Sequence, residues 1–246
     1  KPRFSFIRMV KKKIQKKEIK KILNKKEIQN KQIMWAVILS ISVILIIIFV
    51  PLITKNFVNK FVYIKLDFQK TKLGEIIFYS TSVPVTAGDK IIGGYTMNFR
   101  NDPRELENVE IDIPQNLIGF KKQNIVYITL NPGMEPCEDH TIALMNLAGF
   151  LKDFTNLNVS SGISDKEEAE INNIPYVTCE NHPNNTVLEI TSGEKTLIKK
   201  IDENCYLMMY NNCEITQVTE KFMLAILEPY MNYFTKKDAS FLDMFR

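Results

Sequence analysis

The sequence predicts one N-terminal transmembrane helix followed by a single α+β domain of mostly antiparallel or mixed sheet with two main helices. Three observations predict this class: an unbroken apolar run near the N-terminus, several short alternating β-type segments after it, and two segments with helical periodicity. We expect four parts: a basic arm over 1–32, the transmembrane helix over 33–54, a connector with a first strand over 55–72, and the domain over 73–246.

The predicted transmembrane helix runs from Ile33 to Thr54 and contains no Asp, Glu, Lys, Arg or His. At about 1.5 Å per residue it is roughly 33 Å long, which is enough to cross a hydrocarbon core of about 30 Å. Trp35 lies near one end, where an amphipathic ring suits the membrane interface. A cleaved signal peptide would need a small-residue site after its apolar part, but the sequence there is VPLITKNF. We therefore expect a retained span.

The charge distribution predicts the orientation of that span. The first 32 residues hold 13 Lys or Arg and two acidic residues, a net charge of +11. The whole chain has 32 basic and 28 acidic residues, so the rest holds 19 basic and 26 acidic, a net charge of −7. Positive segments stay in the cytoplasm, and all four cysteines follow the span. We expect a cell-membrane protein with a cytoplasmic N-terminus and an extracytoplasmic domain. Glycosylation-type triplets begin at Asn158 and Asn184, but such triplets are frequent by chance in an Asn-rich chain and carry little weight.

The basic arm is predicted to form an amphipathic helix over Phe4–Gln29, since it lacks Pro and Gly and has apolar residues at helical spacing. We expect it to lie on the anionic headgroups of membrane lipid. A groove on a partner protein and a ribosomal RNA surface are the alternatives, and nucleic acid is expected nowhere else in the chain. The lysines of this surface are Lys11, Lys12, Lys13, Lys16, Lys17, Lys20, Lys21, Lys25 and Lys26.

Short runs rich in β-branched and aromatic residues predict the strands of the domain. Gly, Asn and Asp clusters separate them, and Arg100–Arg104 reads as a turn. The last four strands are expected to form an antiparallel meander. The predicted strands are Phe61–Phe68, Glu75–Val85, Lys90–Phe99, Glu110–Ile113, Asn124–Leu130, Tyr176–Cys179, Thr186–Thr191, Thr196–Ile201 and Cys205–Tyr210.

Two longer segments predict helices, which we expect on one face of the sheet. His140–Phe154 has Leu144, Leu147, Ala148 and Leu151 at helical spacing, with Asp139 as its cap. Thr216–Phe234 is the second, with a kink at Pro229. The capping-box spacing from Ser164 to Glu167 predicts a short third helix.

The cysteines admit two interpretations. Disulfides fit the predicted elements, with Cys179 ending one strand and Cys205 beginning another, and with Cys137 and Cys213 each preceding a helix; the sequence leaves the three pairings open. Alternatively, Cys137-x-x-His140 and Cys179-x-x-His182 together would supply the ligands of a tetrahedral zinc site. We expect disulfides and no cofactor, with zinc as the alternative.

Part of the chain resembles uncharacterised single-pass membrane proteins of archaea. The residues that carry the resemblance are Tyr95–Arg104, Val126–Pro132, and Cys179 and Cys205 spaced around a Thr-Val-Leu-Glu-Ile strand. The resemblance implies an archaeal cell-surface domain with a Cys179–Cys205 bridge, and it carries no activity.

No motif of a known catalytic site is present in the sequence, which lacks Gly-x-Ser-x-Gly and His-Glu-x-x-His, and no catalytic residue is predicted. We therefore expect a non-enzymatic structural or interaction subunit that contacts other proteins in a membrane or cell-surface assembly. Two alternatives remain: a surface-tethered zinc- or thiol-dependent enzyme using the paired Cys-x-x-His, and a tether that binds ribosome or translocon through the arm.

Overall fold

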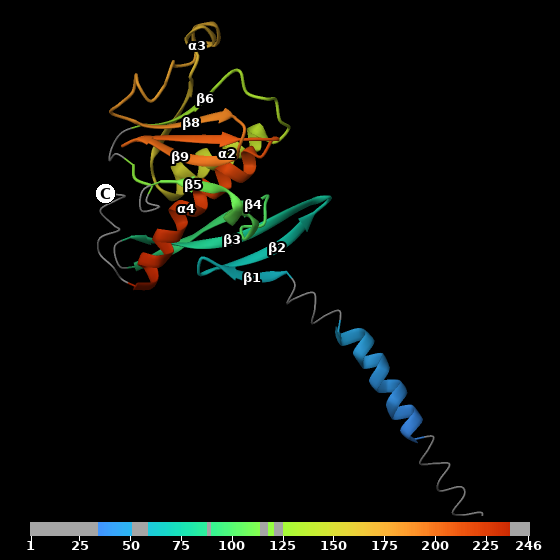
Figure 1. The fold of residues 1–246 in the computed structure, drawn as a ribbon. Coiled ribbons are helices and arrows are strands. Elements are labelled where there is room, and N and C mark those ends of the chain that lie inside the picture. The colour runs from blue at the N-terminus through green and yellow to red at the C-terminus, as the bar shows by residue number, and fades with distance from the viewer. Residues whose placement is uncertain (1–33, 51–58, 88–89, 114–117, 121–124, 237–246) are drawn as a thin grey trace, which may run out of the picture. The chain divides into compact units, whose positions relative to one another are not determined.

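The computed structural model describes residues 34–50, 59–87, 90–113, 118–120 and 125–236 (Figure 1). The chain divides into two compact units, Lys1–Val58 and Asn59–Arg246. In the first unit, residues 34–50 form a helix whose apolar side chains are exposed along its whole length. Among the described residues, no helix meets the combined length and hydropathy needed to cross a membrane. Ile33, residues 51–54 and the basic arm with its lysines lie outside the described residues.

The second unit begins with an antiparallel sheet of four strands in the order β1-β2-β3-β4. Its inner face is aromatic, with Phe61 stacked on Phe68, which meets Phe99 edge to face. Its outer face is polar, and Ser80 donates a hydrogen bond to Asn98 across β3 and β4. The strands are β1 (Lys60–Tyr63), β2 (Leu66–Leu73), β3 (Ile76–Ala87) and β4 (Lys90–Phe99).

The prediction that Phe61–Phe68 forms one strand and belongs to a connector is wrong. The chain reverses at Ile64 and Lys65, and β1 pairs with β2 so that Tyr63 faces Leu66. Both turn residues have positive φ, 44° and 62°, as two-residue hairpin turns require. A β-branched residue rarely adopts this conformation, and the turn carries no Gly or Asn that would have predicted it. Ile64 is held there because its side chain packs against the core.

A mixed sheet of six strands follows, in the order β5-β9-β10-β8-β6-β7. β7, β6, β8 and β10 are parallel to one another, β9 is antiparallel to β10, and β5 is parallel to β9. The strands are β5 (Glu110–Asp112), β6 (Ile125–Leu130), β7 (Asn158–Ile163), β8 (Thr186–Ser192), β9 (Leu197–Asp202) and β10 (Cys205–Tyr210).

The predicted antiparallel meander is wrong in two respects, although most strand positions are confirmed. β10 lies between β8 and β9, so those two strands are not neighbours. The side chains of Tyr206, Met208 and Tyr210 are fully buried, which favours a central position for β10, whereas β9 carries exposed charged residues and lies outside it. The predicted strand Tyr176–Cys179 is reduced to one parallel bridge between Tyr176 and Ile163.

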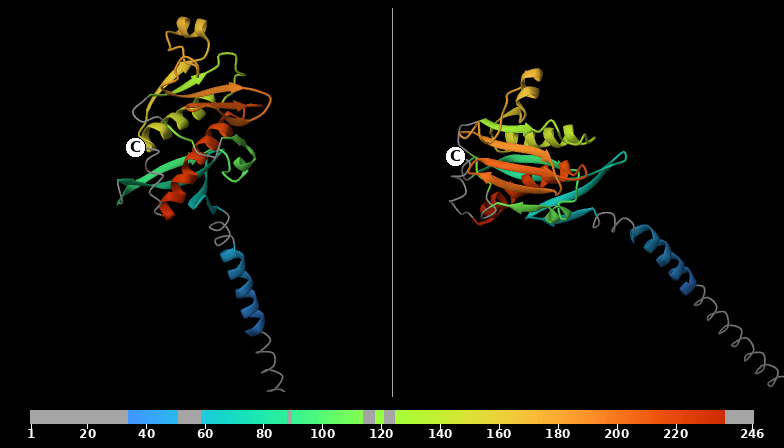
Figure 2. Two further views of the ribbon diagram at one scale, coloured as in Figure 1. Left: turned by 60° about the vertical axis from the view of Figure 1, so that its left-hand side comes forward. Right: turned by 45° about the horizontal axis from the view of Figure 1, so that its top comes forward.

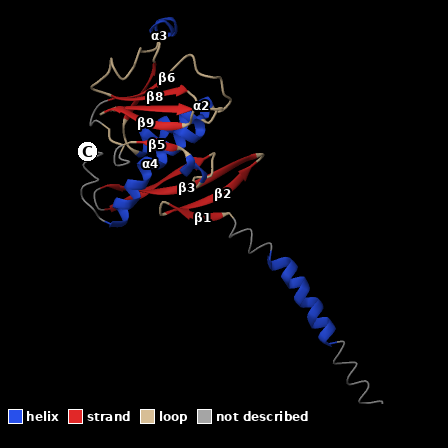
Figure 3. Ribbon diagram, viewed as in Figure 1, coloured by secondary structure: helices blue, strands red, loops and turns tan. Residues whose placement is uncertain are grey.

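The two main helices lie between the two sheets, which makes three layers (Figures 2 and 3). Helix α4 (Ile215–Lys236) contacts the mixed sheet where Phe222 meets Tyr206, and the antiparallel sheet where Tyr230 Oη donates to Pro84 O. Helix α2 (His140–Gly149) continues into the π-helical turn η3 (Phe150–Phe154), where Phe154 packs on Tyr95 of β4. The prediction of two helices on one face of the sheet is confirmed for the mixed sheet.

Helix ends differ from prediction in detail. The side chain of Asp139 makes no cap hydrogen bond and instead lies 3.7 Å from Arg100 Nη2. The short helix α3 (Lys166–Asn172) is capped by Asp165, whose carboxylate accepts from Glu168 N–H at 3.0 Å, one residue later than expected. The chain stays helical through Pro229.

A buried carboxylate ties α4 to the end of β4. Glu220 is 2% exposed and accepts hydrogen bonds from Arg100 N–H at 2.5 Å and from the backbone and side-chain N–H groups of Asn101 at 3.1 and 2.8 Å. Burial raises the pKa of Glu220 to about 7, although these donors act in the opposite direction. The 3₁₀ helix η1 (Glu105–Asn108) follows, after Asp102 and Arg104 have closed the predicted turn with a bidentate ion pair.

Gly162 of β7 allows the segment after α3 to lie directly on the mixed sheet. A Cβ atom at Gly162 would lie 2.7 Å from Cβ of Val177, which is fully buried there. Thr129 Oγ1 also donates to Val177 O at 2.9 Å. The segment therefore covers part of the outer face of this sheet.

Replacing Gly162 by alanine is expected to lower the free energy of unfolding by about 2 kcal/mol, because overpacking forces Val177 outward. Gly149→Ala is the matched control: a Cβ there meets nothing within 4 Å, and removing a helical glycine stabilises by about 1 kcal/mol. Urea unfolding followed by circular dichroism measures both variants. Equal effects of the same sign would show that Val177 is not packed as described.

Candidate partner-binding surface

Helix α2 is apolar around most of its circumference, and part of that surface is not covered. Ala143 and Leu147 are buried between the sheets. On the other side Ile142 is 40% and Met145 69% exposed. A helix that is apolar all round is normally buried, so this face of α2 has the composition of a contact surface.

An apolar groove of about 400 Å³ lies beside the exposed face of α2. Leu144 and Ala148, which the sequence placed in the core, are half-buried and line its helical wall. The opposite wall comes from β6 and β7, and Lys152 supplies the only charged side chain among the residues that line it. The lining residues are Ile128, Leu130, Leu144, Met145, Ala148, Gly149, Lys152, Val159, Ser160 and Ser161.

The groove runs beside an open sheet edge. β7 pairs with β6 on one side and is the last strand of the mixed sheet in the described chain. Among the described residues, only its C-terminal end has a backbone partner on the other side, where Ile163 N–H donates to Pro175 O and Ile163 O accepts from Val177 N–H. The strand reads NVSSGI and lacks the charged residues and prolines that usually protect an edge.

An open edge beside an apolar groove can accept an extended peptide. The peptide backbone would pair with β7, and every second side chain would point toward the groove. The opposite edge strand, β5, has three residues only and offers less backbone to pair with. The α2–β7 surface, meaning the groove and the edge of β7 from Asn158 to Ser161, is therefore the best candidate for a protein contact.

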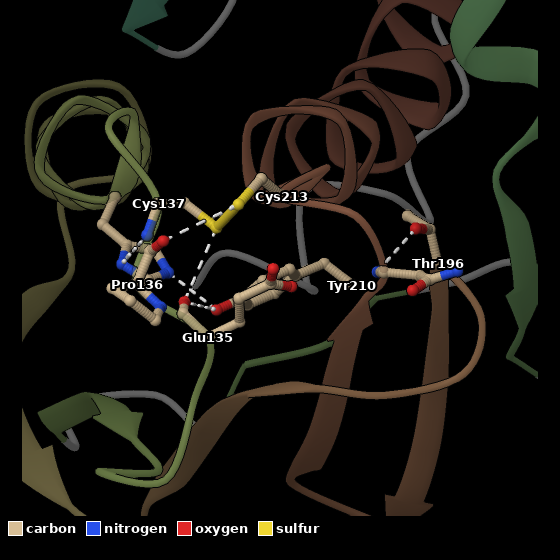
Figure 4. Close-up of a disulfide and its surroundings, with 8 residues drawn as sticks. Glu135, Pro136, Cys137, Thr196, Tyr210 and Cys213 are labelled. Carbon is tan, nitrogen blue, oxygen red and sulfur yellow. Dashed lines mark hydrogen bonds between the residues drawn. A yellow bond between two sulfur atoms is a disulfide. The ribbon is translucent and has the colours of Figure 1, made fainter.

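The cysteines form two disulfides, Cys137–Cys213 and Cys179–Cys205, with Cα–Cα distances of 5.5 and 5.6 Å. The first joins the loop after β6 to the turn before α4 (Figure 4). The second fixes the segment before β8 to the start of β10. These are the pairs that the predicted elements favoured.

The two disulfides lie at opposite ends of β10, since Cys205 begins this strand and Cys213 follows its last residue. Six residues of strand span about 17 Å. Cys137 and His140 therefore do not converge with Cys179 and His182. Among the residues that the structure describes, no group of three or more His, Cys, Asp and Glu side chains could hold a metal ion.

Each histidine has a local partner instead. His140 Nε2 lies 2.7 Å from Tyr210 Oη, which donates to Glu135 O at 3.1 Å (Figure 4). Burial, and then the charge of Glu135, raise the pKa of Tyr210. His182 packs edge to face on Tyr127, with ring centroids 5.0 Å apart. Beside the second disulfide, burial raises the pKa of Glu189, whose Oε2 lies 3.8 Å from Cys179 Sγ.

The glycosylation triplets lie in different settings. Asn158 is exposed and begins β7. Asn184 is exposed in the loop before β8.

The sequence did not predict β7, because Asn-Val-Ser-Ser-Gly-Ile alternates only weakly between apolar and polar residues. The uncovered face of α2 did have a signal in the sequence, since residues 142–151 are apolar with almost no interruption.

Comparison of this chain with protein families, with curated proteins and with solved structures found no match.

Proposed function

We propose that this chain is a non-enzymatic, membrane-anchored subunit whose disulfide-bonded domain binds an extended segment of another protein at the α2–β7 surface. The observation that carries the proposal is the apolar groove beside the unprotected edge of β7. Unpaired backbone on a strand is best satisfied by another strand, which identifies the occupant as an extended segment with apolar residues at alternate positions.

The anchor is the apolar segment Ile33–Thr54. The helix over 34–50 presents exposed apolar side chains along its length, as a helix facing lipid does. The +11 arm favours the cytoplasmic side for the N-terminus, and the two disulfides favour an oxidising compartment for the domain. Lipid headgroups are the proposed partner of the arm. The resemblance to archaeal surface proteins agrees with this arrangement.

Replacing Met145 by glutamate is expected to reduce capture of the partner at least ten-fold, because it places a charge in the apolar groove. The full-length protein is affinity-captured from native membranes after mild cross-linking, and co-purifying proteins are quantified by mass spectrometry. Ile171→Glu on α3 is the matched control, since Ile171 is 77% exposed and lies outside the groove.

The proposal requires that the Ile171→Glu variant still captures the partner protein whose capture the Met145→Glu variant loses. A protein captured equally by both variants is not bound at the α2–β7 surface. A full-length protein that is monomeric in detergent and captures nothing would contradict the interaction function as a whole.

A further inference from the structure

The Cys137–Cys213 disulfide differs from its counterpart in accessibility. Cys213 is exposed and Cys137 is half-buried, whereas in the other disulfide Cys179 is half-buried and Cys205 is 3% exposed at the start of a central strand. Cys213 follows Asn212 in a turn at the carboxyl ends of the parallel strands, where the loops after β6 and β10 meet (Figure 4). Solvent thiols can therefore reach Cys213 without opening the core.

The backbone that carries Cys213 is held in an unfavourable conformation. Asn212 and Cys213 have φ of 48° and 59°, in the left-handed region, which asparagine adopts readily but which is unfavourable for cysteine. The bond to Cys137 and the hydrogen bond from Asn211 N–H to Thr196 Oγ1 hold this turn in place. Opening the disulfide frees the turn to relax, which favours the reduced form.

Both cysteines lie immediately before long helices. Cys137 precedes α2 by three residues and Cys213 precedes α4 by two. The positive end of a helix dipole stabilises a thiolate. His140 lies against Cys137, whose N–H donates to His140 Nδ1 at 3.4 Å. Because Cys213 is the exposed sulfur, it is the one that a solvent thiol attacks, and the departing sulfur is Cys137.

We propose that Cys137–Cys213 is a thiol–disulfide exchange site that oxidises dithiols, with Cys213 as the sulfur that is attacked. One thiolate of the dithiol bonds to Cys213 Sγ, the disulfide breaks, and its electron pair leaves with Cys137 Sγ. The second thiol of the dithiol then displaces Cys213. The dithiol becomes a disulfide, and its two protons end on Cys137 and Cys213. This activity is separate from partner binding at the α2–β7 surface.

The test equilibrates the full-length protein in detergent with mixtures of reduced and oxidised dithiothreitol, traps thiols by alkylation, and quantifies each cysteine by mass spectrometry. Cys137 and Cys213 are expected to become reduced together while Cys179 and Cys205 stay bonded. The equilibrium should favour reduction of the first pair at least ten-fold, about 30 mV. Circular dichroism shows whether the domain stays folded.

Glutathione identifies the attacked sulfur. Reduced glutathione should form a mixed disulfide on Cys213 of the native protein. Oxidised glutathione, which releases one reduced glutathione on exchange, should modify the free Cys213 of Cys137→Ser faster than the free Cys137 of Cys213→Ser. Reduction of Cys137–Cys213 at the same ratio as Cys179–Cys205, or only with loss of the folded signal, would overturn the proposal, as would a mixed disulfide on Cys137.

Discussion

Replacing Cys179 and Cys205 together by serine is expected to lower the free energy of unfolding of the domain by about 3 kcal/mol. The two cysteines are 26 residues apart, and closing a loop of this length removes about that much conformational free energy from the unfolded chain. Denaturant unfolding of the full-length protein in detergent, followed by circular dichroism, measures the difference from the parent under non-oxidising, non-reducing conditions.

Loss of the Cys179–Cys205 disulfide should first destabilise the segment that this disulfide fixes to the mixed sheet. Val177 is fully buried over Gly162, and its carbonyl accepts from Thr129. Hydrogen exchange at Val177 N–H, which donates to Ile163 O, should therefore accelerate more than exchange in β10 or β8. Unchanged protection at Val177 with an unchanged midpoint would show that the bond does not hold this segment.

Raising the pH from 4.5 to 8 is expected to destabilise the domain by about 3 kcal/mol through Glu220. Its pKa is about 7 in the folded protein and near 4.5 when unfolded, and each unit of difference corresponds to about 1.4 kcal/mol. The folded state binds the proton more tightly, so the stability is fully present below pH 4.5. It is lost as the pH rises through 7, where the buried carboxyl must ionise.

Glu220→Gln is expected to remove this slope, because its side chain stays neutral at every pH. Stability against urea is measured between pH 4.5 and 8 for both proteins. Glu189→Gln is the control, since burial also raises the pKa of Glu189 but its side chain is half-buried. If the loss of stability with rising pH persists in Glu220→Gln and disappears in Glu189→Gln, then Glu189 and not Glu220 causes it, which would contradict the prediction.

Local signals in the sequence were sufficient for most elements of the fold. Alternation and β-branched residues located β3, β4, β6, β8, β9 and β10, and helical periodicity located α2 with η3 and α4. Which strands lie side by side depends on long-range packing. β10 is central because both of its faces are apolar, and a four-residue connection between β8 and β9 reads as a hairpin even though β10 separates the two strands.

The turn at Ile64 and Lys65 could not be predicted from the sequence, for a different reason. Local preference there favours a continuous strand, and the core contact of Ile64 outweighs it. Glu220 could not be predicted either, because its partners at Arg100 and Asn101 are about 120 residues away in sequence.

The candidate surface could also be predicted only in part. The apolar composition of α2 is evident from the sequence, but the exposure of this helix depends on β7, a weakly alternating strand that becomes the edge of the mixed sheet. The pairing of the cysteines was favoured by the predicted elements. The zinc alternative required Cys137 and Cys179 to converge, and the length of β10 separates them.

The central claim is that the open edge of β7 pairs with an extended segment of another protein. A photo-reactive amino acid at Ser161, which is exposed on β7, tests this in native membranes, with the same group at Ile171 as control. We expect the group at Ser161 to cross-link one protein, at an extended apolar segment of that protein. The same protein should not be cross-linked by the group at Ile171. Labelling of lipid alone from Ser161, or of the same proteins from both positions, would contradict the claim.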